Sequence, residues 1–141
     1  MTEVHDSPSE WVAEHIQRYV DTDGADGQNW RGVPTLLLTT TGRKSGELRR
    51  TALIYGEHGT SYLVVASRGG APSHPSWYLN LTADPQVQLQ VGPDKFSAIA
   101  RTATEAERAE LWPKMALIWP DYDSYQAKTE RQIPIVVLDR A

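Results

Sequence analysis

The chain has 141 residues with 14 basic and 18 acidic side chains, a formal net charge of -4 and no cysteine. This length fits one domain with a single core, and the lack of cysteine excludes disulfides, thiolate metal sites and a cysteine nucleophile. The acidic balance argues against nucleic-acid binding. No apolar run approaches the roughly 20 residues that span a bilayer, and the first residues lack the pattern of a secretory signal. The sequence therefore predicts a cytoplasmic protein with one domain over residues 9–141, preceded by a disordered segment, 1–8.

The hydrophobic pattern predicts a mainly β, α+β protein. A modest apolar stripe indicates an N-terminal helix that begins at Ser7 or Ser9. Apolar, β-branched and alternating runs separated by glycine-rich turns then indicate strands. The expected strands are 33–41, 48–57, 60–67, 86–91, 96–103 and 133–140, and the expected later helices are 76–83, 104–118 and 120–131. Six antiparallel strands in a chain of this length, with helices before the last strand, favour a small barrel whose edges are closed.

The helices carry features of their own. The N-terminal helix is expected to pack on the core, with a lid or a membrane-surface helix as alternatives. Its polar face, with Glu10, Glu14 and Arg18, has too little basic excess to favour the membrane. In the helix 104–118, Thr104 is the expected N-cap, and Pro113 predicts a kink or a break.

A basic turn is the first candidate site. The stretch GRKSGELRR, residues 42–50, places two basic pairs around one short turn in an acidic chain. It is not a nucleotide P-loop, because the glycine spacing is wrong and a strand follows the turn. Arg43, Lys44, Ser45 and Arg49 can nevertheless converge on one anion. The alternative is a solvated hairpin tip.

Two further stretches are candidates. The strand that ends at Ser67 is followed by Arg68 and two glycines, which permit close backbone approach to a flat ligand. Trp119, Tyr122 and Tyr125 recur at three-residue spacing and give a short helix one aromatic face, which either packs in the core or caps a pocket for a planar substrate. The histidines show no metal-ligand spacing, so no metal site is expected.

Together these stretches resemble a known family. The segments TTTGRKSG, ASRGGAPSHPSWYLNL and TERQIPIVVL occur in this order, and the resemblance covers residues 34–138. The chain is similar to the deazaflavin (F420)-dependent nitroreductases of actinobacteria, which are reductases with a split β-barrel like that of flavin reductases and pyridoxamine-phosphate oxidases. F420 carries a ribitol chain, a phosphodiester and a polyglutamate tail. The resemblance therefore implies that the basic turn holds an anionic tail.

The resemblance also implies a set of site residues. Arg43, Lys44 and Ser45 match positions that hold the phosphate and tail. Other positions run along the cofactor or line its ring and ribitol side, namely Arg49, Arg50, Thr51, Ala52, Leu53, Val65, Ala66, Ser67, Arg68, Ser76, Trp77, Tyr78, Leu79 and Asn80. Substrate positions are Trp119, Tyr122 and Tyr125, and the groups implied in catalysis are Tyr122, Ser67 and Tyr125.

The implied reaction is hydride transfer from reduced F420 to an electron-poor acceptor, which is a quinone, an enone or a nitroaromatic. The proton that must follow comes from Tyr122, Ser67 or solvent. Close relatives of the nitroimidazole-activating enzyme have a tyrosine in place of Trp119, so the substrate wall is altered here. Two alternatives stay open: an FMN-dependent reductase of the same fold, and a non-catalytic F420 carrier. FMN has a single phosphate and would leave much of the basic turn unused.

Overall fold

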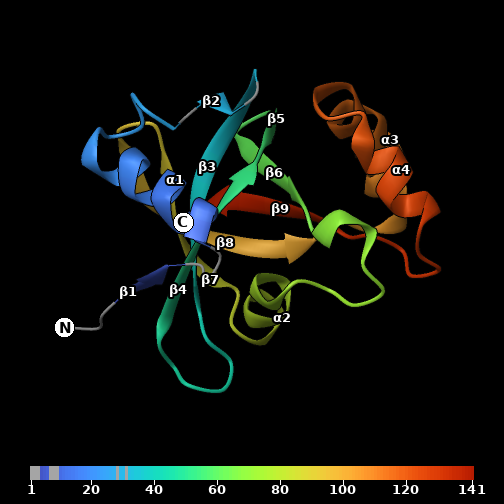
Figure 1. The fold of residues 1–141 in the computed structure, drawn as a ribbon. Helices are drawn as coiled ribbons and strands as arrows, with labels where there is room; N and C mark the ends of the chain where they lie inside the picture. The colour runs from blue at the N-terminus through green and yellow to red at the C-terminus, as the bar shows by residue number, and fades with distance from the viewer. Residues whose placement is uncertain (1–3, 7–9, 28, 31) are drawn as a thin grey trace.

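The computed structural model describes residues 4–6, 10–27, 29–30 and 32–141 (Figure 1). Most of the described strands belong to one curled sheet with the order β1-β4-β3-β7-β8-β9-β6-β5, and β2 pairs with β3 outside this path. The strands are β1 (Val4–Asp6), β2 (Asn29–Trp30), β3 (Val33–Thr41), β4 (Leu48–Ile54), β5 (Gly56–His58), β6 (Ser61–Val65), β7 (Gln86–Val91), β8 (Asp94–Thr102) and β9 (Ile135–Arg140). The helices are α1 (Glu10–Asp21), α2 (Ser76–Ala83), α3 (Glu105–Ile118) and α4 (Asp121–Ala127), with a 3₁₀ turn η1 at Arg68–Gly70.

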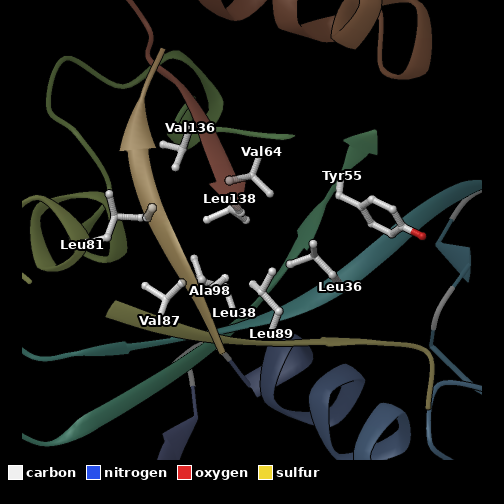
Figure 2. Close-up of a cluster of buried hydrophobic side chains, with 11 residues drawn as sticks. Leu36, Leu38, Tyr55, Val64, Leu81, Val87, Leu89, Ala98, Val136 and Leu138 are labelled. Atoms are coloured by element: carbon white, nitrogen blue, oxygen red, sulfur yellow. The ribbon is translucent and has the colours of Figure 1, made fainter. Parts of the chain in front are cut away.

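The inner face of the curled sheet encloses the main hydrophobic core (Figure 2). Alternate residues of β3, β7, β8 and β9 point inward, as expected for strands with one buried face. Leu81 on α2 covers one end of this core. The cluster comprises Leu36, Leu38, Tyr55, Val64, Leu81, Val87, Leu89, Ala98, Ala100, Val136 and Leu138.

The segment predicted as one strand, 48–57, is divided at Tyr55. Its first part is β4 and pairs with β3, whereas its second part is β5 and pairs with β6. A side chain at Gly56 would lie 2.6 Å from Sδ of Met115, so glycine at this position leaves room for the α3 side chains beside β5. The division corrects the expectation of a barrel with closed edges. In the described part of the chain, β4 beyond Arg50 pairs only with β3, and the barrel is split there.

Helix α1 packs on the outer face of β3 and β4. Ile16 and Tyr19 are fully buried against Leu37. The Tyr19 hydroxyl accepts a hydrogen bond of 2.6 Å from the Gly92 N–H and lies 3.1 Å from the Thr35 carbonyl oxygen. The predicted packing of this helix on the core is confirmed, whereas the expected start at Ser7 or Ser9 falls outside the described residues.

Three other expectations, one for the N-terminal segment and two for the helix after β8, meet different outcomes. Residues 4–6, expected to be disordered, form β1 and pair in parallel with Leu48–Arg50, which gives the start of β4 a second neighbour. Thr104 caps α3 in a capping box with Glu107, as predicted. Pro113 lies inside α3 without ending it, and Leu111 and Met115 on either side are buried. None of the described helices is long and apolar enough to cross a bilayer.

Candidate functional site

The turn between β3 and β4 is docked on α2. The Gly42 N–H donates to the Glu47 carbonyl at 2.7 Å and closes the turn. The backbone N–H and the Nη1 of Arg43 lie 3.2 and 2.9 Å from Oδ1 of Asn80. Asn80 is buried in α2 and donates its amide to Thr40 at 3.2 Å. One guanidinium of the basic turn therefore has a fixed position beside α2.

The other polar residues of the turn divide over two faces of β4. Lys44 and Ser45 are exposed at the tip, and Arg49 pairs with Glu47 at 3.1 Å. Successive residues of a strand point to opposite faces. Arg50 consequently lies on the α1 side, where it lines a separate hollow. Arg50 is therefore separated from Lys44 and Arg49, which are the two exposed cations of the expected anion site.

Helix α2 contacts this turn along the side that carries Ser76 and Asn80. The Ser76 carbonyl accepts a bond of 3.5 Å from Arg43 Nη1. Trp77 and Tyr78 pack against the main core, and the Tyr78 hydroxyl shares a hydrogen bond of 2.8 Å with Thr102. These two rings consequently hold α2 in place beneath the sheet.

The backbone after β6 is held by a single guanidinium that the sequence did not single out. Arg131 donates to three carbonyl oxygens, at 3.2 Å on Ala66, 2.7 Å on Ser67 and 2.8 Å on Ala71. Its Nη1 also lies 3.0 Å from Nδ1 of His74. Burial, and then the charge of Arg131, lower the pKa of His74. A neutral His74 therefore accepts from Arg131, and together they fix the position of Ser67.

Arg68 and the two glycines that follow form a tight left-handed turn. Arg68 has a φ of 47°, and Gly69 and Gly70 have φ values of 62° and 83°. A side chain at Gly70 would lie 2.7 Å from the Tyr125 carbonyl oxygen. The close approach at Gly70 is therefore to α4, whereas the sequence predicted an approach to a flat ligand. The Arg68 guanidinium itself is exposed and donates to Ser73.

The free edge of β4 faces the split in the barrel. The Tyr55 N–H donates to the Pro34 carbonyl at 3.2 Å, so Tyr55 directs its backbone groups toward β3. Along an antiparallel strand, successive residues direct their backbone groups alternately toward and away from the partner strand. By this alternation the backbone groups of Ala52 and Ile54 point away from β3. Beyond Arg50 no strand of the described chain pairs on that side. Two unpaired donors and two unpaired acceptors are therefore available along one short edge.

A cavity of about 300 Å³ opens at this edge. Its described lining is mostly apolar and aromatic and includes no carboxylate, ammonium or guanidinium group. Helix α1, β2, β3, β4, β6, η1 and α4 all contribute to it. The lining residues are Val12, His15, Trp30, Thr35, Ala52, Leu53, Ile54, Val65, Ser67, Gly69, Trp119, Tyr122 and Tyr125.

Aromatic rings form much of one wall of the cavity. Trp30 and Trp119 meet at a centroid distance of 5.4 Å, which joins β2 to the end of α3. Tyr122 and Tyr125 meet edge to face at 6.1 Å. Trp119 Nε1 donates to the Tyr125 hydroxyl at 3.3 Å. The three aromatic residues expected to form a substrate wall are therefore brought together at one cavity, and Trp30 extends the wall.

Hydroxyl groups supply the polarity of this wall. Ser67 is 9% exposed and Tyr122 is 4% exposed. Burial, and then the neighbouring Tyr125, raise the pKa of Tyr122. Its hydroxyl therefore keeps its proton near neutral pH and acts as a hydrogen-bond donor. Such a site suits a flat, neutral ligand with exocyclic oxygen atoms.

Sequence reasoning missed several lining residues. Trp30 lies in a glycine- and aspartate-rich stretch that reads as a loop, and its pairing with β3 has no strong local signal. Val12 and His15 reach the cavity because α1 packs on β3 and β4, which is a tertiary arrangement. His15 and Trp30 lie far along the chain from the motif residues, so no regular residue spacing connects them with the site. Among the described residues, no group of three potential metal ligands is found.

Comparison with known proteins identifies the family. Residues 11–140 match the profile of the family described as F420H(2)-dependent quinone reductase. The F420H(2)-dependent quinone reductase Rv1261c of Mycobacterium tuberculosis is 39% identical over 145 residues, which cover 94% of this chain and 97% of that protein. This match confirms the expectation of an F420H2-dependent reductase.

Solved structures agree with the fold. A structure described as a domain-swapped dimer has a TM-score of 0.73 and 39% identity, covering 94% of this chain and 100% of that one. An F420-H2 dependent reductase (FDR-A) has a TM-score of 0.70 and 41% identity, covering 75% and 94%. A pyridoxamine 5′-phosphate oxidase-like protein from Listeria innocua shares the fold alone, with a TM-score of 0.53 and 9% identity. These likenesses confirm the expected split barrel, and the chain belongs to the F420H(2)-dependent quinone reductase family.

Proposed function

We propose that the cavity at the split of the barrel is the active site of an F420H2-dependent quinone reductase, and that the basic turn holds the tail of the cofactor. The observation that carries this proposal is the path of β4. Its first residues adjoin the basic turn, and Ala52–Ile54 line the cavity. At about 3.3 Å per residue, the strand covers about 13 Å between Arg49 and Leu53. One elongated ligand can therefore occupy both ends.

The turn fits the anionic part of F420. Arg43 is held in place by Asn80, so its guanidinium loses little freedom when it contacts a phosphate. Lys44 is exposed at the tip and adds a mobile positive charge. Arg49 must exchange its pairing with Glu47 for a ligand carboxylate or phosphate. Charge-assisted hydrogen bonds of this kind are stronger than neutral ones.

The free edge of β4 fits the ring part of F420. A fused heteroaromatic ring presents alternating donors and acceptors along one edge, and the backbone of Ala52 and Ile54 presents the complementary groups. Reduced F420 supplies the hydride when it is bound there. The chain itself orients the ring, and the apolar side chains of Leu53 and Val65 exclude water from that part of the cavity.

The acceptor then lies between the ring and the aromatic wall. Trp30 and Trp119 offer flat apolar surface, and Ser67 and Tyr122 offer hydroxyl donors to a carbonyl oxygen. Because donors placed where negative charge develops stabilise a transition state, they favour hydride transfer to a quinone. Enones have the same carbonyl pattern and are expected acceptors. We infer weaker reduction of nitroimidazoles, because Trp119 is bulkier than the tyrosine of the nitroimidazole-activating relatives.

Two measurements on the purified protein test this proposal. The first is an equilibrium titration with F420 and, separately, with FMN. The second follows the oxidation of reduced F420 with and without a naphthoquinone. Tight F420 binding with quinone-dependent oxidation supports the reductase. Binding without turnover of any quinone or enone would indicate a carrier, and preferential binding of FMN would indicate the other alternative.

A further inference from the structure

His15 presents an imidazole to the cavity from α1. It is 5% exposed. Its Nε2 lies 2.7 Å from the carbonyl oxygen of Gly27. Because a carbonyl oxygen only accepts hydrogen bonds, Nε2 must carry a proton, and this fixes the tautomer. Nδ1 is therefore the nitrogen left for a ligand.

The position of Nδ1 follows from two observations. No hydrogen bond to it is found among the described residues, and no fully enclosed side-chain nitrogen or oxygen in the described chain lacks a partner. Nδ1 must therefore reach open space. His15 and Val12, one helical turn apart, both line the cavity, and the cavity is the open space that His15 adjoins.

His15 differs in kind from the other polar groups of the described lining. The titratable groups there are Tyr122 and Tyr125, and Tyr19 stacks on His15 from the same helix at 6.5 Å. Burial raises the pKa of Tyr122 and of Tyr19, so neither hydroxyl readily gives up its proton. Imidazole, by contrast, is the side chain that most often transfers protons near neutral pH.

We propose that His15 gives the acceptor its proton in the reaction of the proposed function, on which this inference rests. The quinone receives a hydride from reduced F420, that is, two electrons and one hydrogen, and becomes a hydroquinone monoanion. The Nδ1–H bond of protonated His15 breaks and an O–H bond forms, giving the hydroquinone. The imidazole regains a proton from water, and the other hydrogen that the reduced cofactor gives up leaves as a proton to water, so that the two proton transfers balance. The carbonyl of Gly27 supports the charged imidazole through Nε2–H throughout.

When His15 is replaced, the Gly27 carbonyl that it contacts still has a hydrogen-bond donor. The Gly27 carbonyl also accepts a bond of 2.6 Å from the Thr35 hydroxyl. His15→Gln keeps a polar side chain but cannot transfer a proton. With saturating reduced F420 and 2-methyl-1,4-naphthoquinone, it should lower kcat at least about tenfold and change KM less than about threefold. His58→Gln, the same substitution at an exposed histidine outside the cavity, should leave both unchanged.

Chemical rescue separates proton transfer from a structural role. His15→Ala leaves a space that opens into the cavity, so added imidazole should raise kcat of this variant severalfold and should not raise kcat of His58→Gln. A full kcat in His15→Gln, or a His15→Ala variant that imidazole does not rescue, would overturn the proposal.

A measurement on the wild-type protein without cofactor tests the contact of His15 with the acceptor even if the variants do not fold. The ring ¹⁵N resonances of His15 should shift on addition of the naphthoquinone or its hydroquinone, whereas those of His58 should not. Unmoved His15 resonances at a saturating concentration of both would contradict the contact. If His15 shifts but the wild type does not oxidise reduced F420 with any quinone, the proposed function fails while the contact of His15 with the ligand stands.

Discussion

Removal of two positive charges from the basic turn should weaken F420 binding far more than folding. The double substitution Lys44→Ala with Arg49→Ala removes the two turn cations that are not anchored on α2. Each unit charge at about 4 Å from an anion in water is worth about 1 kcal/mol. Loss of both should therefore cost about 2 kcal/mol, which is about a thirtyfold increase in Kd. Because Arg49 must first leave Glu47, Lys44 should account for more of this loss.

The strand itself provides the control for this prediction. Arg50→Ala removes one charge from the residue next to Arg49, but on the opposite face of β4, and should change Kd for F420 less than about threefold. Fluorescence titrations of both variants at low and high salt form the assay. The double variant should approach the wild type at high salt, because screening weakens the wild-type attraction. Equal Kd values for the wild type and the double variant at low salt would refute the assignment of the turn as the tail site.

Five further outcomes are expected. F420 should bind at least about tenfold more tightly than FMN, a difference of about 1.4 kcal/mol in competitive titration, and the opposite order would favour an FMN enzyme. Tyr122→Phe should lower kcat for a naphthoquinone by about tenfold with Kd for F420 unchanged. Trp119→Tyr should raise the turnover of nitroimidazoles relative to that of quinones. If steady-state assays give each variant the wild-type rates and the wild-type order of substrates, both rings serve packing alone. Arg131→Ala should lower the free energy of unfolding in urea by about 2–4 kcal/mol, because three carbonyls lose a charged donor; a change below about 1 kcal/mol would contradict this. The folded state lowers the pKa of His74. The stability that neutral His74 contributes should therefore be present above about pH 6.5 and be lost as the pH falls below this value and through the lower pKa of the folded state. Between pH 8 and pH 5 the melting temperature should fall less in His74→Gln than in the wild type, and parallel curves would show that His74 does not link pH to stability.

The local part of this structure could be predicted from the sequence. Residues 33–41 and 86–91 have the alternation or β-branching of strands and form β3 and β7 with the expected bounds. Residues 76–83 form α2 as expected, since Asp84-Pro85 follows and stops a helix. The aromatic spacing of Trp119 and Tyr122 predicted a wall on one helix face, and the structure places both at the cavity. Local propensity and local pattern suffice for such elements.

The tertiary part could not be predicted in the same way. The strand 48–57 divides at Tyr55 because its two parts pair with different strands, β3 and β6, and no local signal in the segment reports those partners. Arg49 and Arg50 point to opposite faces of the predicted strand, but which of the two faces α1 covers depends on tertiary packing. Arg131 holds the backbone near Ser67 across a separation of 64 residues. Its role, like that of His15, depends on which segments the fold brings together.

The proposed function requires one ligand to extend along β4 from the basic turn to the cavity. A crystal structure of the chain with bound F420 would show whether it does. The deazaflavin ring should lie against the backbone of Ala52–Ile54, with the phosphate within hydrogen-bond distance of Arg43 or Lys44. A ring bound elsewhere, or a tail that leaves the turn untouched, would rule out this arrangement.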